Sequence, residues 1–168
     1  MKQLYLLRHG ETEIGSVSGE DHDRGLTATG KSNARILSQW MEQKNYMPQN
    51  ICCSSALRTM ETLNEIVTEL FINHEKVLPP IITERHFYLA SAEKLLFEIN
   101  AADDQIDHLL IVAHNPGIAE LALNLAGRDH IDKIYGYVPG TMTVFQTDCD
   151  QWADLRDANT QFIDIFTP

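Results

Sequence analysis

The sequence predicts an α/β fold in which a mostly parallel sheet lies between two layers of helices. Short apolar runs of strand length alternate with longer segments whose apolar residues recur at helical spacing. Strands that alternate with helices pair in parallel, because each helix returns the chain to the same edge of the sheet. The chain has 168 residues, of which 43% are hydrophobic, which is enough for one core. We therefore expect a three-layer αβα sandwich formed by a single domain over residues 1–168.

The alternation of strands and helices continues as far as Gly127, a residue suited to end a helix. Thr27, Ser91 and Asn115 are suited to cap the helices that follow them, and Pro116 fits a first helical position. The expected elements are a strand at 4–7, a helix from 28 through 41, a strand at 50–55, a helix at 56–71, a short strand at 81–83, a helix from 91 to 99, a strand at 109–113 and a helix at 116–125.

After Gly127 the pattern favours strands. Residues 141–147 alternate as a strand does, and the segments 152–156 and 162–166 are candidates for edge strands. A polar segment at 11–24 joins the first strand to the first helix. It is expected to be a loop at the functional site, because ligand-binding residues concentrate on loops that a rigid scaffold positions.

Composition excludes several classes of function. The net charge is −11, from 24 acidic and 13 basic residues, which argues against binding to nucleic acid or anionic membranes in general. No apolar run approaches the length of a membrane span, and the run after Lys2 is too short for a signal peptide, so we expect a cytoplasmic protein. The three cysteines, Cys52, Cys53 and Cys149, have no CxxC spacing, so neither a disulfide framework nor a zinc site is expected.

Candidate catalytic residues follow three of the predicted strands. Arg8 and His9 close the first strand, Arg58 comes just after the second, and His114 follows the strand at 109–113. Carboxyl ends of parallel strands meet at one edge of the sheet, so these side chains should converge. Histidine can act as a nucleophile, and the guanidinium fork of arginine matches the oxygens of a phosphoryl group. A single histidine at a strand end is more often structural, so the convergence is what predicts phosphate chemistry.

Several motifs together resemble the histidine phosphatase superfamily, and among its members the SixA-type phosphohistidine phosphatases. The resemblance implies a phosphoglycerate mutase-like fold. It covers about residues 1–127. It is carried by the segments 6–10 (Leu-Leu-Arg-His-Gly), 21–24 (Asp-His-Asp-Arg) with Leu26, Thr27 and Gly30, 54–58 (Ser-Ser-Ala-Leu-Arg) with Thr62, 88–91 (Tyr-Leu-Ala-Ser) and 112–117 (Val-Ala-His-Asn-Pro-Gly).

The resemblance implies a role for each residue of the central set. His9 would attack phosphorus and become transiently phosphorylated, while Arg8 and Arg58 would hold the phosphoryl oxygens. His114 would donate a hydrogen bond to one of these oxygens. Water would then hydrolyse the phosphohistidine. The arginines supply the electrostatic stabilisation in this scheme, so no metal and no cofactor are expected.

The remaining site predictions concern substrate contacts and a proton donor. Arg24 would contact the substrate or its phosphate, Asn115 lies at a helix N-terminus, and Gly10 leaves room for a ligand to approach the backbone. Glu84 is the candidate general acid, with Asp21 and Asp23 as alternatives. A solvated, non-catalytic Glu84 is at least as plausible, and a phosphohistidine substrate would relax the need for an acid.

Several readings of function stay open. The substrate is either a phosphohistidine on a partner protein or a small phosphate ester, and a non-catalytic phosphate-binding module is a further alternative. Cys52 and Arg58 imitate the spacing of the cysteine-dependent phosphatases, although the intervening loop has no glycine. The segment Asp21-His22-Asp23 together with His9 and His114 is a weaker candidate for a metal site, because no two of these histidines have ligand-like spacing.

Overall fold

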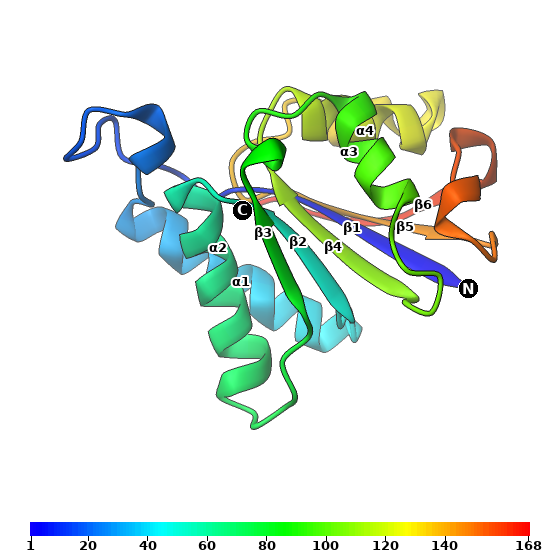
Figure 1. Cartoon of the computed structure of the whole chain (residues 1–168), viewed down its shortest axis with the longest axis horizontal. Helices are drawn as coiled ribbons and strands as arrows, with labels where there is room; N and C mark the ends of the chain where they lie inside the picture. The colour runs from blue at the N-terminus through cyan, green and yellow to red at the C-terminus, as the bar shows by residue number, and fades with distance from the viewer.

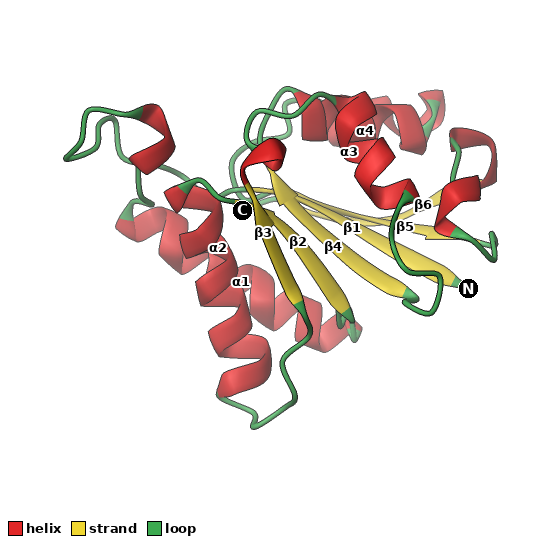
Figure 2. Cartoon of the chain, viewed as in Figure 1, coloured by secondary structure: helices red, strands yellow, loops and turns green.

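The computed structural model describes all residues 1–168 and has the expected three layers. Figure 1 shows a twisted sheet with α1 and α2 on one face and α3 and α4 on the other, and Figure 2 shows the same sandwich coloured by secondary structure. The α-helices are α1 (Ala28–Lys44), α2 (Leu57–Val67), α3 (Ala92–Asn100), α4 (Gly117–Ala126) and the short α5 (Ile131–Ile134). The strands are β1 (Lys2–Arg8), β2 (Asn50–Ser54), β3 (Ile81–Glu84), β4 (His108–Ala113), β5 (Met142–Thr147) and β6 (Thr160–Phe166).

The sheet is mixed but mostly parallel, which confirms the predicted fold class. Its six strands lie in the order β3-β2-β4-β1-β5-β6. The four strands from β3 to β1 are parallel, whereas β5 pairs antiparallel with both β1 and β6. Strands β2, β4 and β1 are therefore neighbours, and their carboxyl ends lie side by side.

Two apolar cores lie on opposite faces of the sheet, because successive side chains of a strand alternate between its faces. On β1, Leu4 and Leu6 pack into the core beneath α3 and α4, whereas Tyr5 and Leu7 pack into the core beneath α1 and α2. All four side chains are at most 1% exposed. Burial on both faces explains why β1 reads as a continuous apolar run.

The expected helix caps are partly confirmed. The hydroxyl of Thr27 accepts from the Gly30 amide at the start of α1, and that of Ser91 accepts from the Lys94 amide at the start of α3. The prediction for Asn115 is wrong, because α4 begins at Gly117 with Pro116 in the capping position and no side chain caps it.

Two predicted elements differ from the structure. Residues 152–156 do not form an edge strand, because Trp152–Asp154 is a 3-10 helix whose indole is fully buried and donates to the carbonyl oxygen of Ile106 at 2.8 Å. Burial of this large side chain outweighs the strand pattern. The second helix ends its regular α-helical turns at Val67 and continues as a π-helix to Ile72.

Two glycines allow close backbone approaches that position the site. A Cβ at Gly30 would overlap the carbonyl oxygen of Glu11, and a Cβ at Gly117 would overlap the carbonyl oxygen of Ala90. The segment after β1 therefore packs directly on α1, and the segment before α3 packs directly on α4. No helix is both long enough and apolar enough to cross a membrane.

Candidate active site

Three adjacent strands bring together Arg8, His9, Arg58 and His114, which we call the Arg-His cluster. Arg8 ends β1 and His9 follows it, His114 follows β4, and Arg58 lies in the first turn of α2 just after β2 (Figure 1). The imidazole rings of His9 and His114 lie 5.2 Å apart between centroids. Both arginines are close enough to lower the pKa of His9. The predicted convergence of these four residues therefore occurs.

The hydrogen bond of His9 fixes the tautomer of its ring. Its Nδ1 lies 2.8 Å from the carbonyl oxygen of Gly10. A carbonyl oxygen only accepts, so Nδ1 carries the proton and Nε2 keeps its lone pair. Burial, aided by the positive charges of Arg58 and Arg8, lowers the pKa of His9 to about 4 against the Gly10 hydrogen bond. At neutral pH the ring is therefore uncharged, with a free nucleophilic nitrogen.

Ser54 favours one tautomer of His114, because Nε2 is the only hydrogen-bond acceptor within reach of its hydroxyl proton. The serine Oγ lies 2.8 Å from His114 Nε2 and accepts a 3.3 Å hydrogen bond from the amide of Ala56. With one acceptor position filled, the hydroxyl proton can donate to Nε2, which leaves the ring proton on Nδ1. That Nδ1 is buried and has no hydrogen-bond partner. Burial, with His9 as the next cause, lowers the pKa of His114 to about 3, so this ring is also neutral.

Arg8 is held at one end and keeps an N–H free. Its Nη1 donates to the carbonyl oxygen of Tyr137 at 2.8 Å, and Asn115 Nδ2 donates to the same oxygen at 3.2 Å. The Nε of Arg8 is buried without a partner. An unpaired buried N–H of a cation is costly, and an anion at this place would satisfy it. Asn115 thus supports the arginine through Tyr137 in this structure.

Arg58 is clamped by the 3-10 turn at Asp21–Asp23. Its guanidinium donates to the main-chain oxygen of Asp21 at 2.7 Å and to the carboxylate Oδ2 at 3.0 Å. It also lies 5.6 Å from the ring centroid of Tyr88. The arginine is only 4% exposed, so its remaining N–H groups point into a protected space. These contacts fix the direction in which Arg58 can offer hydrogen bonds.

Asp21 joins the loop at 11–24 to the rest of the site. Its carboxylate accepts from Tyr88 Oη at 2.6 Å and from Arg24 Nη1 at 2.8 Å, in addition to Arg58. The hydrogen bond from Tyr88, followed by that from Arg24, holds the pKa of Asp21 well below its ordinary value. The group is a permanent carboxylate here, so it is a poor proton donor.

Arg24 uses three of its donors within its own loop. They reach Asp21, the carbonyl oxygen of Glu13 at 2.7 Å and the hydroxyl of Thr12 at 2.6 Å. Its charge is also among the causes that lower the pKa of His9. The side chain therefore shapes the loop beside the cluster, and its contact with a substrate stays a prediction.

Gly10 lies beside the Arg-His cluster, whereas Glu84 does not contact it. The amide of Gly10 donates to the buried hydroxyl of Thr62 at 2.9 Å, and its α-carbon faces the main-chain oxygen of Gly30, so the residue lies in the wall of the cluster. Glu84 is exposed at the end of edge strand β3, and no side-chain hydrogen bond or ion pair joins it to the cluster. The structure thus brings Gly10, but not Glu84, into contact with the site, and the general-acid role of Glu84 stays a prediction.

The structure offers neither a reactive cysteine nor a group of metal ligands. Burial raises the pKa of the Cys52 thiol to about 11 and that of the Cys53 thiol to about 12, so neither provides a thiolate at neutral pH. Cys52 packs against the apolar core beneath α3 and α4. No three His, Cys, Asp or Glu side chains are close enough to hold a metal ion.

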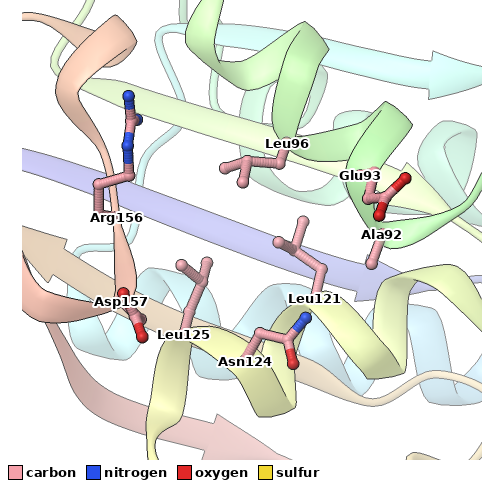
Figure 3. A pocket seen from close by; sticks show the side chains of 8 residues that line it. All are labelled: Ala92, Glu93, Leu96, Leu121, Asn124, Leu125, Arg156 and Asp157. Carbon is pink, nitrogen blue, oxygen red and sulfur yellow. The ribbon is translucent and has the colours of Figure 1, made fainter.

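A separate groove lies between α3 and α4. It has a volume of about 340 Å³ and is closed on one side by Arg156 and Asp157 (Figure 3). Leucine side chains from both helices line its floor, and it contains no residue of the Arg-His cluster. The chemistry and the groove are therefore distinct features of the molecule.

Sequence reasoning missed the residues that hold the cluster in place. Four of these residues were given no role from the sequence: Ser54, Thr62, Tyr88 and Tyr137. Tyr88 Oη reaches Asp21, and its ring lies edge-on to His114 at 5.3 Å. Ser54, Thr62 and Tyr88 belong to the motifs that carried the resemblance, which was a signal for them. Tyr137 had none, because it acts through a main-chain oxygen.

Comparison with known proteins assigns a family. A sequence model of the histidine phosphatase superfamily (branch 1) matches residues 4–90, which include Arg8, His9 and Arg58. An uncharacterized protein of Mycobacterium leprae is 26% identical over 152 residues, which cover 88% of this chain and 89% of that protein.

Two phosphohistidine phosphatases are also similar. The phosphohistidine phosphatase SixA of Escherichia coli is 24% identical over 124 residues, covering 73% of each chain. The solved structure of a candidate phosphohistidine phosphatase SixA from Nakamurella multipartitia superposes with a TM-score of 0.84 at 24% identity, covering 99% of this chain and 96% of that one. The structural likeness confirms the fold.

Proposed function

The chain belongs to branch 1 of the histidine phosphatase superfamily, and from this premise we propose that it is a phosphatase whose residues 1–168 form one domain. The Arg-His cluster carries the proposal. It offers one neutral nucleophilic nitrogen, on His9, surrounded by cationic and neutral N–H donors. This set of groups suits a trigonal phosphoryl group in transfer, which needs a nucleophile in line and donors around its equatorial oxygens.

In the first step the Nε2 of His9 attacks phosphorus. A bond forms between Nε2 and phosphorus while the bond from phosphorus to the leaving group breaks, and the leaving atom keeps the electron pair. Nδ1 stays bound to the carbonyl oxygen of Gly10, 2.8 Å away, which stabilises the positive charge that develops on the ring. The ring is oriented before the substrate arrives, so little reorganisation accompanies the attack.

The equatorial oxygens meet three donor groups. Arg8 offers its unpaired Nε–H, Arg58 offers the N–H groups that Asp21 does not use, and His114 offers its unpaired Nδ1–H. In the second step a water oxygen bonds to phosphorus, the bond from phosphorus to Nε2 breaks and its electron pair returns to Nε2. The products are inorganic phosphate and the original enzyme.

The substrate that the site supports best is a phosphohistidine on a protein, as in the SixA-type enzymes. Imidazole leaves readily when its second nitrogen is protonated, so no side-chain acid is required. None of the three carboxylates considered for that role suits it. Hydrogen bonds hold the pKa values of Asp21 and Asp23 below the ordinary value, and Glu84 does not contact the cluster. A hydrolase of small alkyl phosphates would need such an acid to protonate an alkoxide.

A protein substrate also fits the surface beside the site. The loop at 11–24 extends away from the body of the molecule in Figure 1 and carries two fully exposed apolar side chains, Ile14 and Val17. Isolated exposed apolar residues are common, but two on one loop next to a reactive centre suit contact with a partner protein.

The test compares three substrates and one variant. We expect the protein to hydrolyse a phosphohistidine-bearing protein and para-nitrophenyl phosphate without added metal, and a sugar phosphate more slowly. His9→Ala should abolish turnover of all three. Quenched reactions should contain a phosphoenzyme that is labile in acid and stable in alkali, as expected of phosphohistidine. Full activity of His9→Ala would refute the proposal, and phosphate binding without turnover would favour a non-catalytic module.

A further inference from the structure

The exposed side of the Arg-His cluster is lined by three residues of which none has an assigned role in the reaction. His9, Arg58 and His114 are themselves at most 8% exposed. The neighbours that reach solvent include Asp21 and His22, whose side chains are 49% and 20% exposed, and the half-buried Tyr88. In-line transfer places the leaving group opposite the attacking nitrogen, on the open side of the phosphoryl group. These three side chains are therefore candidates to contact a leaving group.

Aromatic rings form a continuous row from the cluster to the surface. The ring centroid of Tyr88 lies 5.3 Å from that of His114 and 5.0 Å from that of His22, both nearly edge-on. His22 is fixed in the row, because Nδ1 donates to Asp23 and Nε2 lies 3.0 Å from Ser55 Oγ. Edge-to-face spacing of this kind also suits a further planar ring placed next to the row.

Asp21 has one acceptor position free at the same place. Its Oδ2 receives Tyr88 and Arg58, whereas its Oδ1 receives only Arg24. A carboxylate has about four acceptor positions, so Oδ1 can take one more donor. The group is half exposed and held ionised, which suits it to bind an N–H of a cationic ring.

We propose that Asp21, Tyr88 and His22 form a leaving-group subsite that binds the ring-protonated imidazole of a phosphohistidine. The inference rests on the proposed function and adds the residues that select the leaving group. The planar ring packs beside the row formed by Tyr88 and His22, and Asp21 Oδ1 accepts the N–H of the ring nitrogen that does not bear phosphorus. The bond from phosphorus to the other ring nitrogen then breaks, this nitrogen takes the electron pair, and a neutral imidazole departs with its N–H intact.

The ionised state of the Asp21 carboxylate suits this role. By accepting the N–H, an ionised Asp21 keeps the substrate ring protonated, so that the departing group is imidazole and not the strongly basic imidazolate. A protonated carboxyl would serve an alkyl phosphate instead. The same residue that is a poor acid is therefore a suitable partner for a phosphoramidate.

The experiment measures kcat/KM of Asp21→Asn for phosphoimidazole and for para-nitrophenyl phosphate. Both substrates have a planar leaving group, but nitrophenolate has no N–H and leaves as an anion. We expect the ratio of the two values, phosphoimidazole over para-nitrophenyl phosphate, to fall at least tenfold, because the cationic ring loses its charged acceptor for one substrate only. The ratio removes any common effect through Arg58, which keeps its contact with the main-chain oxygen of Asp21.

Glu20→Gln is the matched control. Glu20 adjoins Asp21 in the chain and is exposed, and its carboxylate makes no hydrogen bond or ion pair, so the variant removes the same charge without touching the subsite. Its ratio should match that of the native protein. Tyr88→Leu should lower turnover of both substrates relative to an alkyl phosphate, whereas Tyr88→Phe, which keeps the ring, should retain most of it.

The outcomes separate this inference from the proposed function. Equal losses on both substrates in Asp21→Asn, or no loss, overturn the subsite, since Asp21 would then act only through Arg58 or not at all. A native protein that hydrolyses para-nitrophenyl phosphate but not phosphoimidazole refutes the phosphohistidine substrate, and the subsite with it. Persistence of turnover in His9→Ala refutes the proposed mechanism independently of Asp21.

Discussion

Replacement of Ser54 by alanine should impair catalysis through His114, a residue that the substitution does not change. Ser54 is fully buried at the end of β2, and its hydroxyl lies 2.8 Å from Nε2 of His114. By donating to Nε2, that hydroxyl favours the ring proton on Nδ1, the nitrogen that faces no protein partner. Without it, Nε2 becomes a buried nitrogen with no partner, and the proton is free to move there.

The magnitude follows from the bond that is lost. A buried polar atom left unpaired costs about 1–3 kcal/mol, so Ser54→Ala should lower the free energy of unfolding by this amount. Loss of one hydrogen bond to a developing negative charge costs about 1.5–3 kcal/mol, which corresponds to about a 10- to 100-fold fall in kcat/KM. The phosphorylation of His9 should slow by the same factor.

Three measurements test the reasoning. Turnover of para-nitrophenyl phosphate gives kcat/KM, urea denaturation gives the free energy of unfolding, and ¹⁵N chemical shifts of the His114 ring report its tautomer. The control is Ser38→Ala, since Ser38 is equally buried but its hydroxyl donates to the carbonyl oxygen of Ala34 within α1. A Ser54→Ala protein with native kcat/KM, or with the native tautomer, would show that Ser54 does not govern His114.

Three further outcomes are expected. The pKa values of His9 and His114, about 4 and about 3, lie below the ordinary 6.5, so the unfolded chain takes up protons at a higher pH than the folded chain does. The free energy of unfolding should therefore fall by about 1–3 kcal/mol per pH unit from pH 6.5 down to 4. NMR signals of these two rings in the folded protein should show no titration near pH 6.5. Gly117→Ala should lower the free energy of unfolding, measured with heat or urea, by about 1–3 kcal/mol or more, because the added methyl group overlaps the carbonyl oxygen of Ala90. A variant as stable as the native protein would show that the segment before α3 can move to make room. Replacing both Ile14 and Val17 by aspartate should raise KM for a phosphohistidine-bearing protein and leave KM for para-nitrophenyl phosphate unchanged, and an equal rise for both substrates would place the effect in the site itself.

The local pattern of the chain was sufficient for the layers and for the convergence of the Arg-His cluster. Apolar runs of strand length alternate with amphipathic segments, and helices on both sides of a parallel sheet bury the apolar residues of all of them. Parallel strands then align their carboxyl ends. Arg8, His9 and His114 follow directly from this rule, because each adjoins the end of a buried strand. The predicted edge strand at 152–156 is where the local pattern fails, because packing of the large Trp152 side chain decided the local structure there.

The partners of the cluster were decided only by tertiary structure. Tyr137 lies 129 residues from Arg8 in the chain, and Tyr88 lies 67 residues from Asp21, yet each pair is joined by a hydrogen bond of 2.8 Å or less. No periodicity encodes such contacts, because they depend on how loops from different elements meet above the sheet. The sequence alone thus determined which chemical groups gather at the edge of the sheet. The folded chain determined their tautomers, their charges and the directions in which they donate, since burial and hydrogen-bond partners set all three.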